Sequence, residues 1–287
     1  MEILWLGQIE PQLLGTIGRK AGNLSLLADR HRVPPGFCLP MQVHSEALAH
    51  SNGHVTLPKS WHSRVASAYA QLAEQTGQAE PAVAVRSSGV DEDSAVASFA
   101  GQHDTFLNVR GVDGVIEAIH GCWASAHSPR ALAYRQQQGL AQDNARIAVL
   151  VQQLVRADVS AVVFSMNPVS GARDQVVINA SWGLGESIVG GTVNPDTFWV
   201  DKTSHAVLQR VIANKQRMTV SVPGGSREVG VPQLLRTKSS LRDEQTAEMS
   251  QLAVRLEQEM SAPVDVECAF QDTELYLLQC RPITTLT

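Results

Sequence analysis

Two neighbouring segments near the end of the chain alternate between apolar and polar side chains, and this alternation limits how they can fold. The segments are V-D-V-E-C-A-F at 264–270 and E-L-Y-L-L-Q-C-R at 274–281. A period of two is typical of a strand with one buried face, and the polar residues between the segments predict a tight turn. We therefore expect an antiparallel hairpin. A slip of one residue would bury the polar face, so the pattern also predicts the register.

In that register Glu267 lies directly across from Gln279, with Asp265 and Arg281 at the end of the same polar face. A carboxylate beside an amide oxygen suits a hard cation such as Mg²⁺, which keeps phosphate and water ligands. An adjacent Arg suits a phosphate oxygen. On spacing alone, a solvated sheet face with a cross-strand polar pair is the more common arrangement, so both interpretations stay open. The apolar face is expected to contain Val264, Val266, Cys268, Phe270, Tyr276, Leu278 and Cys280.

A lysine near the N-terminus has the small neighbours that phosphate binding requires. The segment I-G-R-K-A-G-N-L at 17–24 places Lys20 between two glycines, just before an apolar run. Small neighbours allow a phosphate to approach backbone N–H groups, and Lys adds a positive charge. The segment is not a Walker A loop, which needs G-x-x-x-x-G-K-[ST]. A plain helix start with a solvated Lys is the alternative.

An arginine follows a short apolar run, A-V-A-V, that is typical of a buried strand. The segment V-R-S-S-G at 85–89 places Arg86 at the end of this strand, before two hydroxyls and a glycine. A guanidinium that leaves a buried strand needs an anion to offset its desolvation. A phosphate and the nearby acids at 91–93 are equally good partners by sequence.

The segment S-F-A-G-Q-H-D-T-F at 98–106 is a loop of small residues that leads into a strand. Such a loop can fold over a nucleotide, with Gly101 allowing close approach and Thr105 offering a hydroxyl. A simple hairpin entry is the alternative. His103 has the chemistry of a general base, but an isolated loop His is more often a surface residue.

Two adjacent glutamines lie in the expected strand that contains V-Q-Q-L at 151–154. Gln152 and Gln153 must point to opposite faces of that strand. The amide of one of them can read an adenine edge, since it offers both a donor and an acceptor. An exposed strand amide is the alternative.

Charge and length argue against several classes of protein. The 287 residues carry 23 basic and 28 acidic side chains, and the net charge of −5 argues against binding to a nucleic-acid backbone. No segment approaches the ~20 apolar residues of a membrane helix. The N-terminus lacks the basic start and the apolar run of a signal peptide. The four cysteines form no C-x-x-C pair, so we expect buried thiols in a reducing cytoplasm rather than zinc ligands or disulfides.

Helical and strand patterns are interleaved without regular βαβ units, so we expect a mixed α/β or α+β architecture. Ser240, followed by Asp243, is expected to begin a helix. The expected strands are 82–86, 104–109, 147–155, 161–165 and 175–181, with a helix over 112–137 and loops at 51–60 and 223–230.

Together these segments resemble the nucleotide-binding part of the phosphoenolpyruvate synthase, pyruvate phosphate dikinase and rifampicin phosphotransferase family. The resemblance runs from about Leu14 to Thr284 and rests on the joint order and spacing of motifs that are weak one by one. The motifs are G-R-K-A-G-N-L, V-P-P-G-F, V-R-S-S, A-S-F-A-G-Q-H-D-T-F-L-N-V, C-W-A-S, V-Q-Q-L-V, S-G-A-R-D, N-A-S-W-G-L-G-E, V-N-P-D-T-F, and D-V-E followed by L-Q-C-R-P.

The resemblance implies an ATP-grasp fold, mainly of antiparallel sheets with flanking helices, in which two lobes hold ATP. One such unit would span residues 1–287, with lobes at about 1–145 and 146–287. Motif by motif, it implies phosphate contacts from Lys20 and Arg86, a covering loop with Gly101 and Thr105, adenine contact from Gln152, Mg²⁺ ligands Glu267 and Gln279, and contact of Arg281 with the transferring phosphate. Lys215 resembles a further family lysine of less certain role.

The implied function is an ATP- and Mg²⁺-dependent phosphotransferase that passes phosphate from ATP to a histidine on a separate domain or protein. Lys20, Arg86 and Arg281 would be its catalytic residues. A kinase or ligase that acts directly on a small molecule and a non-catalytic nucleotide-binding subunit are the alternatives. His205, in T-S-H-A, superficially resembles the family's phospho-histidine motif, but its surroundings predict a hairpin turn.

Overall fold

A computed structural model describes residues 2–49, 55–89, 105–137 and 146–283, and these form two compact units. The first unit comprises Met1–Leu154 with Pro223–Gly225, and the second comprises Val155–Val222 with Ser226–Thr287. The second unit begins at Val155, and the strand at 147–153 is the central strand of the first sheet.

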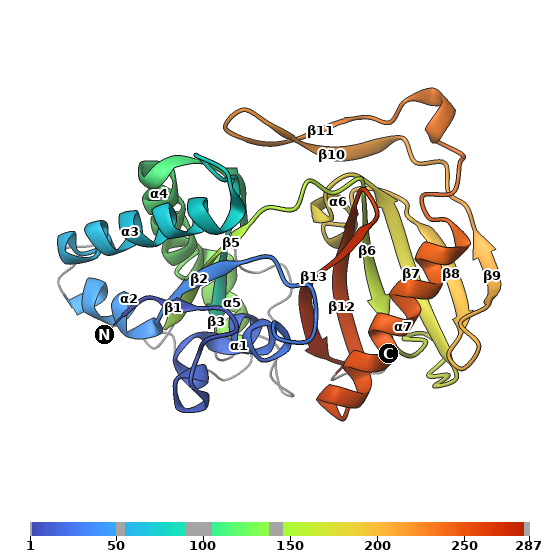
Figure 1. The fold of residues 1–287 in the computed structure, drawn as a ribbon, viewed down its shortest axis with the longest axis horizontal. Coiled ribbons are helices and arrows are strands. Elements are labelled where there is room, and N and C mark those ends of the chain that lie inside the picture. Colours follow the sequence, from blue (N-terminus) through green and yellow to red (C-terminus); the bar gives the residue numbers. More distant parts are fainter. Residues whose placement is uncertain (1, 50–54, 90–104, 138–145, 284–287) are drawn as a thin grey trace. The chain divides into compact units, whose positions relative to one another are not determined.

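The first unit is built on a five-stranded antiparallel sheet with the strand order β1-β2-β5-β3-β4 (Figure 1). Its strands are β1 (Leu4–Trp5), β2 (Gly36–Leu39), β3 (Val83–Gly89), β4 (Thr105–Val109) and β5 (Ile147–Gln153). Its helices are η1 (Pro11–Thr16), α1 (Gly18–Leu27), α2 (Met41–Ala49), α3 (Lys59–Thr76), α4 (Gly111–Ala126) and α5 (Pro129–Gln137).

The two faces of this sheet have different coverings. Val83 and Val85 of β3 lie in a core with apolar residues of α2, α3 and α4. Side chains alternate along a strand, so Arg86 and Ser88 lie on the other face. Helix α1 packs there, because the backbone N–H of Ala21 donates a hydrogen bond of 3.1 Å to Ser88 Oγ. We call this side the α1 face.

The helix expected over 112–137 is interrupted. Helix α4 ends at Ala126, and α5 begins at Pro129. A proline has no N–H to donate to the preceding turn, but its fixed φ suits the first position of a new helix. The expectation of one continuous helix was therefore wrong at this point.

The second unit is built on a six-stranded antiparallel sheet with the strand order β13-β12-β6-β7-β8-β9. Its strands are β6 (Val159–Phe164), β7 (Gln175–Trp182), β8 (Asp196–Asp201), β9 (Val207–Val211), β12 (Val264–Gln271) and β13 (Glu274–Pro282). The unit also contains α6 (Glu186–Val189), most of a hairpin of β10 (Arg217–Val222) and β11 (Gly225–Gly230), η3 (Gln233–Leu235) and α7 (Asp243–Met260).

Helix α7 lies along this sheet and contacts β6, β7, β8 and β12 (Figure 1). Its buried Met249, Leu252 and Leu256 recur at helical spacing and cover the apolar face of the sheet. The opposite face carries the polar residues of the hairpin β12–β13, and we call it the polar face. The predicted mixed architecture of antiparallel sheets with flanking helices is thus confirmed in both units.

Two local expectations were wrong in the second unit. Helix α7 begins at Asp243 with Arg242 as its N-cap and a reciprocal contact from Gln245. Ser240 does not cap it, because its N–H and hydroxyl donate to Asp196 Oδ2 at 2.7 and 2.8 Å. The loop expected at 223–230 is instead a turn followed by strand β11.

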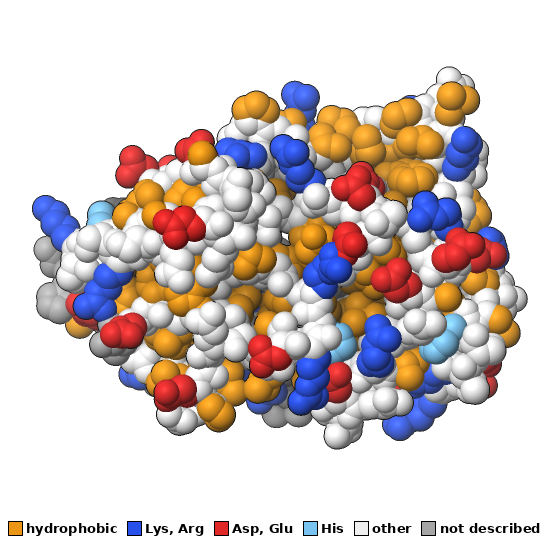
Figure 2. Space-filling model, viewed as in Figure 1, with side chains coloured by type: hydrophobic (Ala, Val, Ile, Leu, Met, Phe, Trp, Pro, Cys, Tyr) orange, Lys and Arg blue, Asp and Glu red, His pale blue; other side chains and the backbone are white. Residues whose placement is uncertain are grey.

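The surface shows a mixture of charges. On the face in Figure 2, basic and acidic side chains are interspersed. This distribution agrees with the net charge of −5. Among the described helices, none is both long and apolar enough to span a bilayer.

Candidate functional site

The hairpin β12–β13 has the predicted register at its polar end. Glu267 pairs directly with Gln279, and Asp265 pairs with Arg281. Directly opposed residues share a face and have Cβ atoms about 4.5–5.5 Å apart. The carboxylate and the amide therefore lie on neighbouring strands of the polar face.

The apolar face of β13 differs from the prediction because of a β-bulge. After Glu267 the register shifts, so that Cys268 pairs with Leu277 rather than with Leu278. An extra residue in one strand turns the following side chains to the other face. Leu277 is therefore buried on the apolar face together with Cys280. Tyr276 and Leu278, which were predicted on that face, are only partly buried. The bulge lies directly beside the Glu267–Gln279 pair.

Arg281 is held in place by Asp265. Its Nε and Nη2 lie 2.8 and 2.7 Å from Asp265 Oδ2, and both side chains are largely buried. Charge-assisted bonds of this length fix the plane of a guanidinium. The alternation predicted both residues on the polar face. The structure also shows that the Asp265 carboxylate orients the Arg281 guanidinium.

The thiols next to this site are on the other side of the sheet. Burial, together with the neighbouring acids Asp265 and Glu259, raises the pKa of Cys280 to about 12. Burial also raises the pKa of Cys268. Thiols that stay protonated do not bind metals, so a metal at this site would use oxygen ligands.

The first unit brings another group of predicted residues together. Arg86 of β3 pairs directly with Thr105 of β4 and with Leu150 of β5. Gln152 lies two residues after Leu150, so it shares the α1 face with Arg86 and Thr105. Three residues that were predicted from separate motifs therefore occupy one side of one sheet.

Lys20 reaches the same strand end from α1. Its Nζ donates a hydrogen bond of 3.3 Å to the backbone oxygen of Ser87, the residue after Arg86. Gly18 permits this approach: its φ is +72°, and a Cβ there would lie 2.3 Å from Ser88 O. Gly18 thus allows α1 to pack closely on β3. This packing places Lys20 beside Ser87, the residue after Arg86.

Gln152 is deeply placed on this face. It is 2% exposed, and its Nε2 donates a hydrogen bond of 3.0 Å to Pro34 O. Gln153, on the other face, is only partly buried. The adenine role of Gln152 stays a prediction. Gly101 and His103 lie outside the described residues.

Lys215 and His205 have partners within the second unit. The Nζ of Lys215 forms an ion pair with Asp196, and it also donates to Ala213 O at 3.2 Å. His205 has a φ of +57° in the turn between β8 and β9, and its Nδ1 lies 3.0 Å from Ser250 Oγ of α7. The predicted hairpin-turn position of His205 is confirmed. The contacts of Asp196 were not predicted, although this residue begins the D-T-F part of the motif V-N-P-D-T-F.

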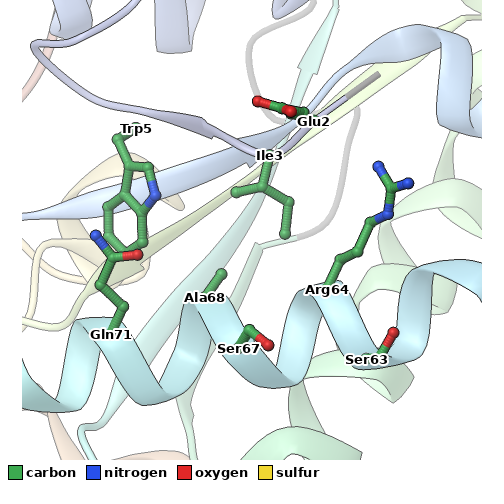
Figure 3. Close-up of a pocket in the computed structure, with 8 residues that line it drawn as sticks. All are labelled: Glu2, Ile3, Trp5, Ser63, Arg64, Ser67, Ala68 and Gln71. Atoms are coloured by element: carbon green, nitrogen blue, oxygen red, sulfur yellow. The ribbon is translucent and has the colours of Figure 1, made fainter.

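A surface pocket of about 460 Å³ lies in the first unit between β1 and α3 (Figure 3). None of the predicted site residues lines it. Its basic residue, Arg64, lies 4.9 Å over the Trp61 ring. The lining residues are Glu2, Ile3, Trp5, Ser63, Arg64, Ser67, Ala68 and Gln71.

Each unit contains one group of the predicted site residues. One combines a carboxylate, an amide oxygen and a fixed guanidinium, and the other combines an arginine, a lysine and a hydroxyl on one sheet face. In the second unit the carboxylate and amide oxygens are ligands that suit a hard cation. In the first unit the arginine, lysine and hydroxyl are groups that suit phosphate oxygens.

Comparison with known proteins identifies the family. Residues 41–287 match the family described as the AMP/ATP-binding domain of pyruvate phosphate dikinase. The chain belongs to this family.

Three curated relatives are each much longer than this chain. A probable phosphoenolpyruvate synthase from Methanocaldococcus jannaschii is 40% identical over 231 residues, which cover 80% of this chain and 19% of the relative. Phosphoenolpyruvate synthase from Pyrococcus furiosus is 38% identical, with 86% and 31% covered. Rifampicin phosphotransferase from Streptomyces sviceus is 33% identical, with 99% and 36% covered. The chain thus spans about a fifth to a third of these relatives.

Proposed function

We propose that this chain binds ATP with Mg²⁺ and transfers phosphate from ATP to a histidine on a separate domain or protein. The observation that carries the proposal is the directly opposed pair Glu267–Gln279, flanked on the polar face by Arg281. Membership of an AMP/ATP-binding domain family supports the nucleotide. The relatives' names support phosphotransfer, since two are synthases of phosphoenolpyruvate and one is a phosphotransferase.

The residues present fit Mg²⁺ rather than a softer metal. Glu267 and Gln279 offer two oxygen ligands from adjacent strands, and the described residues contain no group of three or more His, Cys, Asp or Glu side chains that could hold a metal. Mg²⁺ characteristically takes one or two protein oxygens and keeps its remaining positions for water and phosphate. When bound, the ion would neutralise phosphate charge.

The basic side chains would bind and orient the phosphates. Arg281, fixed by Asp265, presents a guanidinium beside the proposed metal ligands. Lys20 and Arg86 occupy one strand end of the α1 face, where Thr105 adds a hydroxyl. Thr105, predicted in a covering loop, is instead the first residue of strand β4. Phosphoryl transfer depends on positioning and charge neutralisation more than on a covalent protein group, and these residues supply both.

Direct transfer to a small molecule is the second candidate. It is favoured by the relative named rifampicin phosphotransferase, which aligns with 99% of this chain. A nucleotide-binding subunit without turnover is a third possibility, and the complete set of Lys20, Arg86, Glu267, Gln279 and Arg281 argues against it.

Separation of nucleotides after incubation with Mg·ATP distinguishes these functions. We expect AMP to form only when a protein or domain that carries the acceptor histidine is present. ADP formed with a small acceptor alone would instead support direct transfer. ATP binding without turnover under every condition would contradict both enzymatic functions.

A matched pair of variants tests the metal ligand in the same assay. Glu267→Gln should abolish Mg²⁺-dependent turnover while ATP still binds, because it removes the charged ligand with little change in shape. Glu244→Gln, an exposed position at the start of α7, should leave turnover unchanged. Unchanged turnover of Glu267→Gln would contradict the assignment of the metal site.

A further inference from the structure

One straight row of residues crosses the polar face of the second sheet and continues beyond the proposed metal site. Gln279 pairs with Glu267, and Glu267 pairs with Val162 of β6. Val162 pairs in turn with Asn179 of β7, and Asn179 with Thr197 of β8. Directly opposed residues in an antiparallel sheet share a face. Asn179 and Thr197 therefore lie on the same face as the metal pair.

The carboxamide of Asn179 has a defined orientation. Thr197 Oγ1 donates a hydrogen bond of 2.9 Å to Asn179 Oδ1. Because the carbonyl oxygen of the amide turns toward β8, its NH₂ group, which carries two N–H donors, turns away from Thr197. No described residue accepts a hydrogen bond from Nδ2, and Asn179 is only half-buried. The two N–H donors of the Asn179 side chain are thus oriented so that a ligand can accept hydrogen bonds from them.

The spacing matches a phosphate group that is bound by the metal pair. Asn179 is two strands away from Glu267, which corresponds to about 10 Å between backbones. A metal held by Glu267 and Gln279, the phosphate oxygens bound to it and one further hydrogen bond together span roughly this distance. Donors without an acceptor function suit phosphate oxygens.

Resting on the proposed function, we propose that Asn179 binds the terminal phosphate of ATP through its side-chain N–H groups. Thr197 is the positioning residue that turns these donors toward the phosphate. The contact would add a neutral amide donor on the face that carries the charged Arg281, and it would let the site distinguish ATP from ADP.

Binding of ATP and ADP, each with Mg²⁺, to the full chain tests this assignment. Asn179→Leu should weaken ATP binding by about tenfold or more, since a hydrogen bond to a charged group is lost, and should leave ADP binding within about twofold. Thr197→Val should lower ATP affinity by a smaller factor, and Thr197→Ser should restore it. Gln209→Leu, at an exposed position on β9, is the matched control and should change neither affinity. Thermal unfolding of each variant verifies its fold.

The outcomes separate this proposal from the proposed function. If wild type binds ATP and Glu267→Gln loses the effect of Mg²⁺, but folded Asn179→Leu binds ATP like wild type, the role of Asn179 is overturned alone. Equal losses of ATP and ADP affinity also overturn the contact with the terminal phosphate. If folded wild type binds neither nucleotide, the proposed function itself fails.

Discussion

The Nζ of Lys215 lies 2.5 Å from Oδ1 of Asp196, and neither side chain is accessible to solvent. The carboxylate also accepts hydrogen bonds from Ala213 N at 2.9 Å and from the N–H and hydroxyl of Ser240. One buried carboxylate thus joins the first residue of β8, the segment after β9 and the segment before α7. This network gives Lys215 a structural role in the fold of the second unit.

Lys215→Met should destabilise the second unit strongly. Removing one partner of a buried ion pair leaves the other charge uncompensated, at a cost of about 3–5 kcal/mol. Denaturant unfolding measures the loss. Arg217→Met breaks an exposed pair with Glu228 and should cost at most about 1 kcal/mol. A similar small loss for both variants would show that the buried pair contributes little.

Gly18→Ala should weaken both folding and nucleotide binding. The left-handed conformation alone costs a non-glycine residue about 1–2 kcal/mol, and the added Cβ would also collide with Ser88 O. The start of α1 must shift, and Lys20 shifts with it. Gly15→Ala is the matched control, because nothing lies within 4 Å of a Cβ at that position. ATP titration and thermal unfolding should change for the first variant only; equal behaviour of the two variants would contradict the role of this packing.

Mild acid should destabilise the first unit through His44. Burial, followed by the influence of His127, lowers the pKa of His44 from 6.5 to about 4. Between pH 6.5 and pH 4, His44 is protonated in the unfolded chain but neutral in the folded chain. The free energy of unfolding therefore falls as the pH drops from 6.5 toward 4. At pH 5 the loss from His44 is about 2 kcal/mol.

His44→Asn should reduce this pH dependence. The asparagine oxygen can replace Nδ1 as acceptor for the N–H of Ile147, a contact of 3.3 Å in the native protein. The difference in unfolding free energy between variant and wild type, measured at pH 8 and at pH 5, gives the contribution of His44. An identical pH dependence in both proteins would mean that His44 is not held neutral.

The four thiols should be unreactive in the native protein. Cys38, Cys122, Cys268 and Cys280 are free and buried, and burial raises the pKa of Cys38, Cys268 and Cys280. The reactive species is the thiolate, so an aromatic disulfide reagent at pH 8 should label them only after denaturation. Rapid labelling of the folded chain would contradict their burial.

Local patterns in the sequence predicted part of the site well. Alternation on the two strands helped to place Glu267 across from Gln279, because a slip of one residue would bury Gln279 and Arg281. The same pattern could not reveal the bulge after Glu267, since either of the adjacent Leu277 and Leu278 can face the core. Tyr276 and Leu278 were misplaced for this reason.

Contacts between distant segments were beyond the reach of local patterns. Asp196 meets Lys215 and Ser240, and Asn179 meets Thr197, only because the sheet order brings their strands together. In the first unit, Arg86, Thr105 and Lys20 were each singled out by a separate motif. Their shared location required the pairing of β3 with β4 and the packing of α1.

The effect of Mg²⁺ on ATP affinity tests the central claim most directly. ATP is titrated into wild type and Glu267→Gln, each with and without Mg²⁺, and heat is recorded. We predict that Mg²⁺ tightens binding to wild type by about tenfold or more, whereas Glu267→Gln shows no such increase. An equal effect of Mg²⁺ on both proteins, or no ATP binding by folded wild type, would contradict the account.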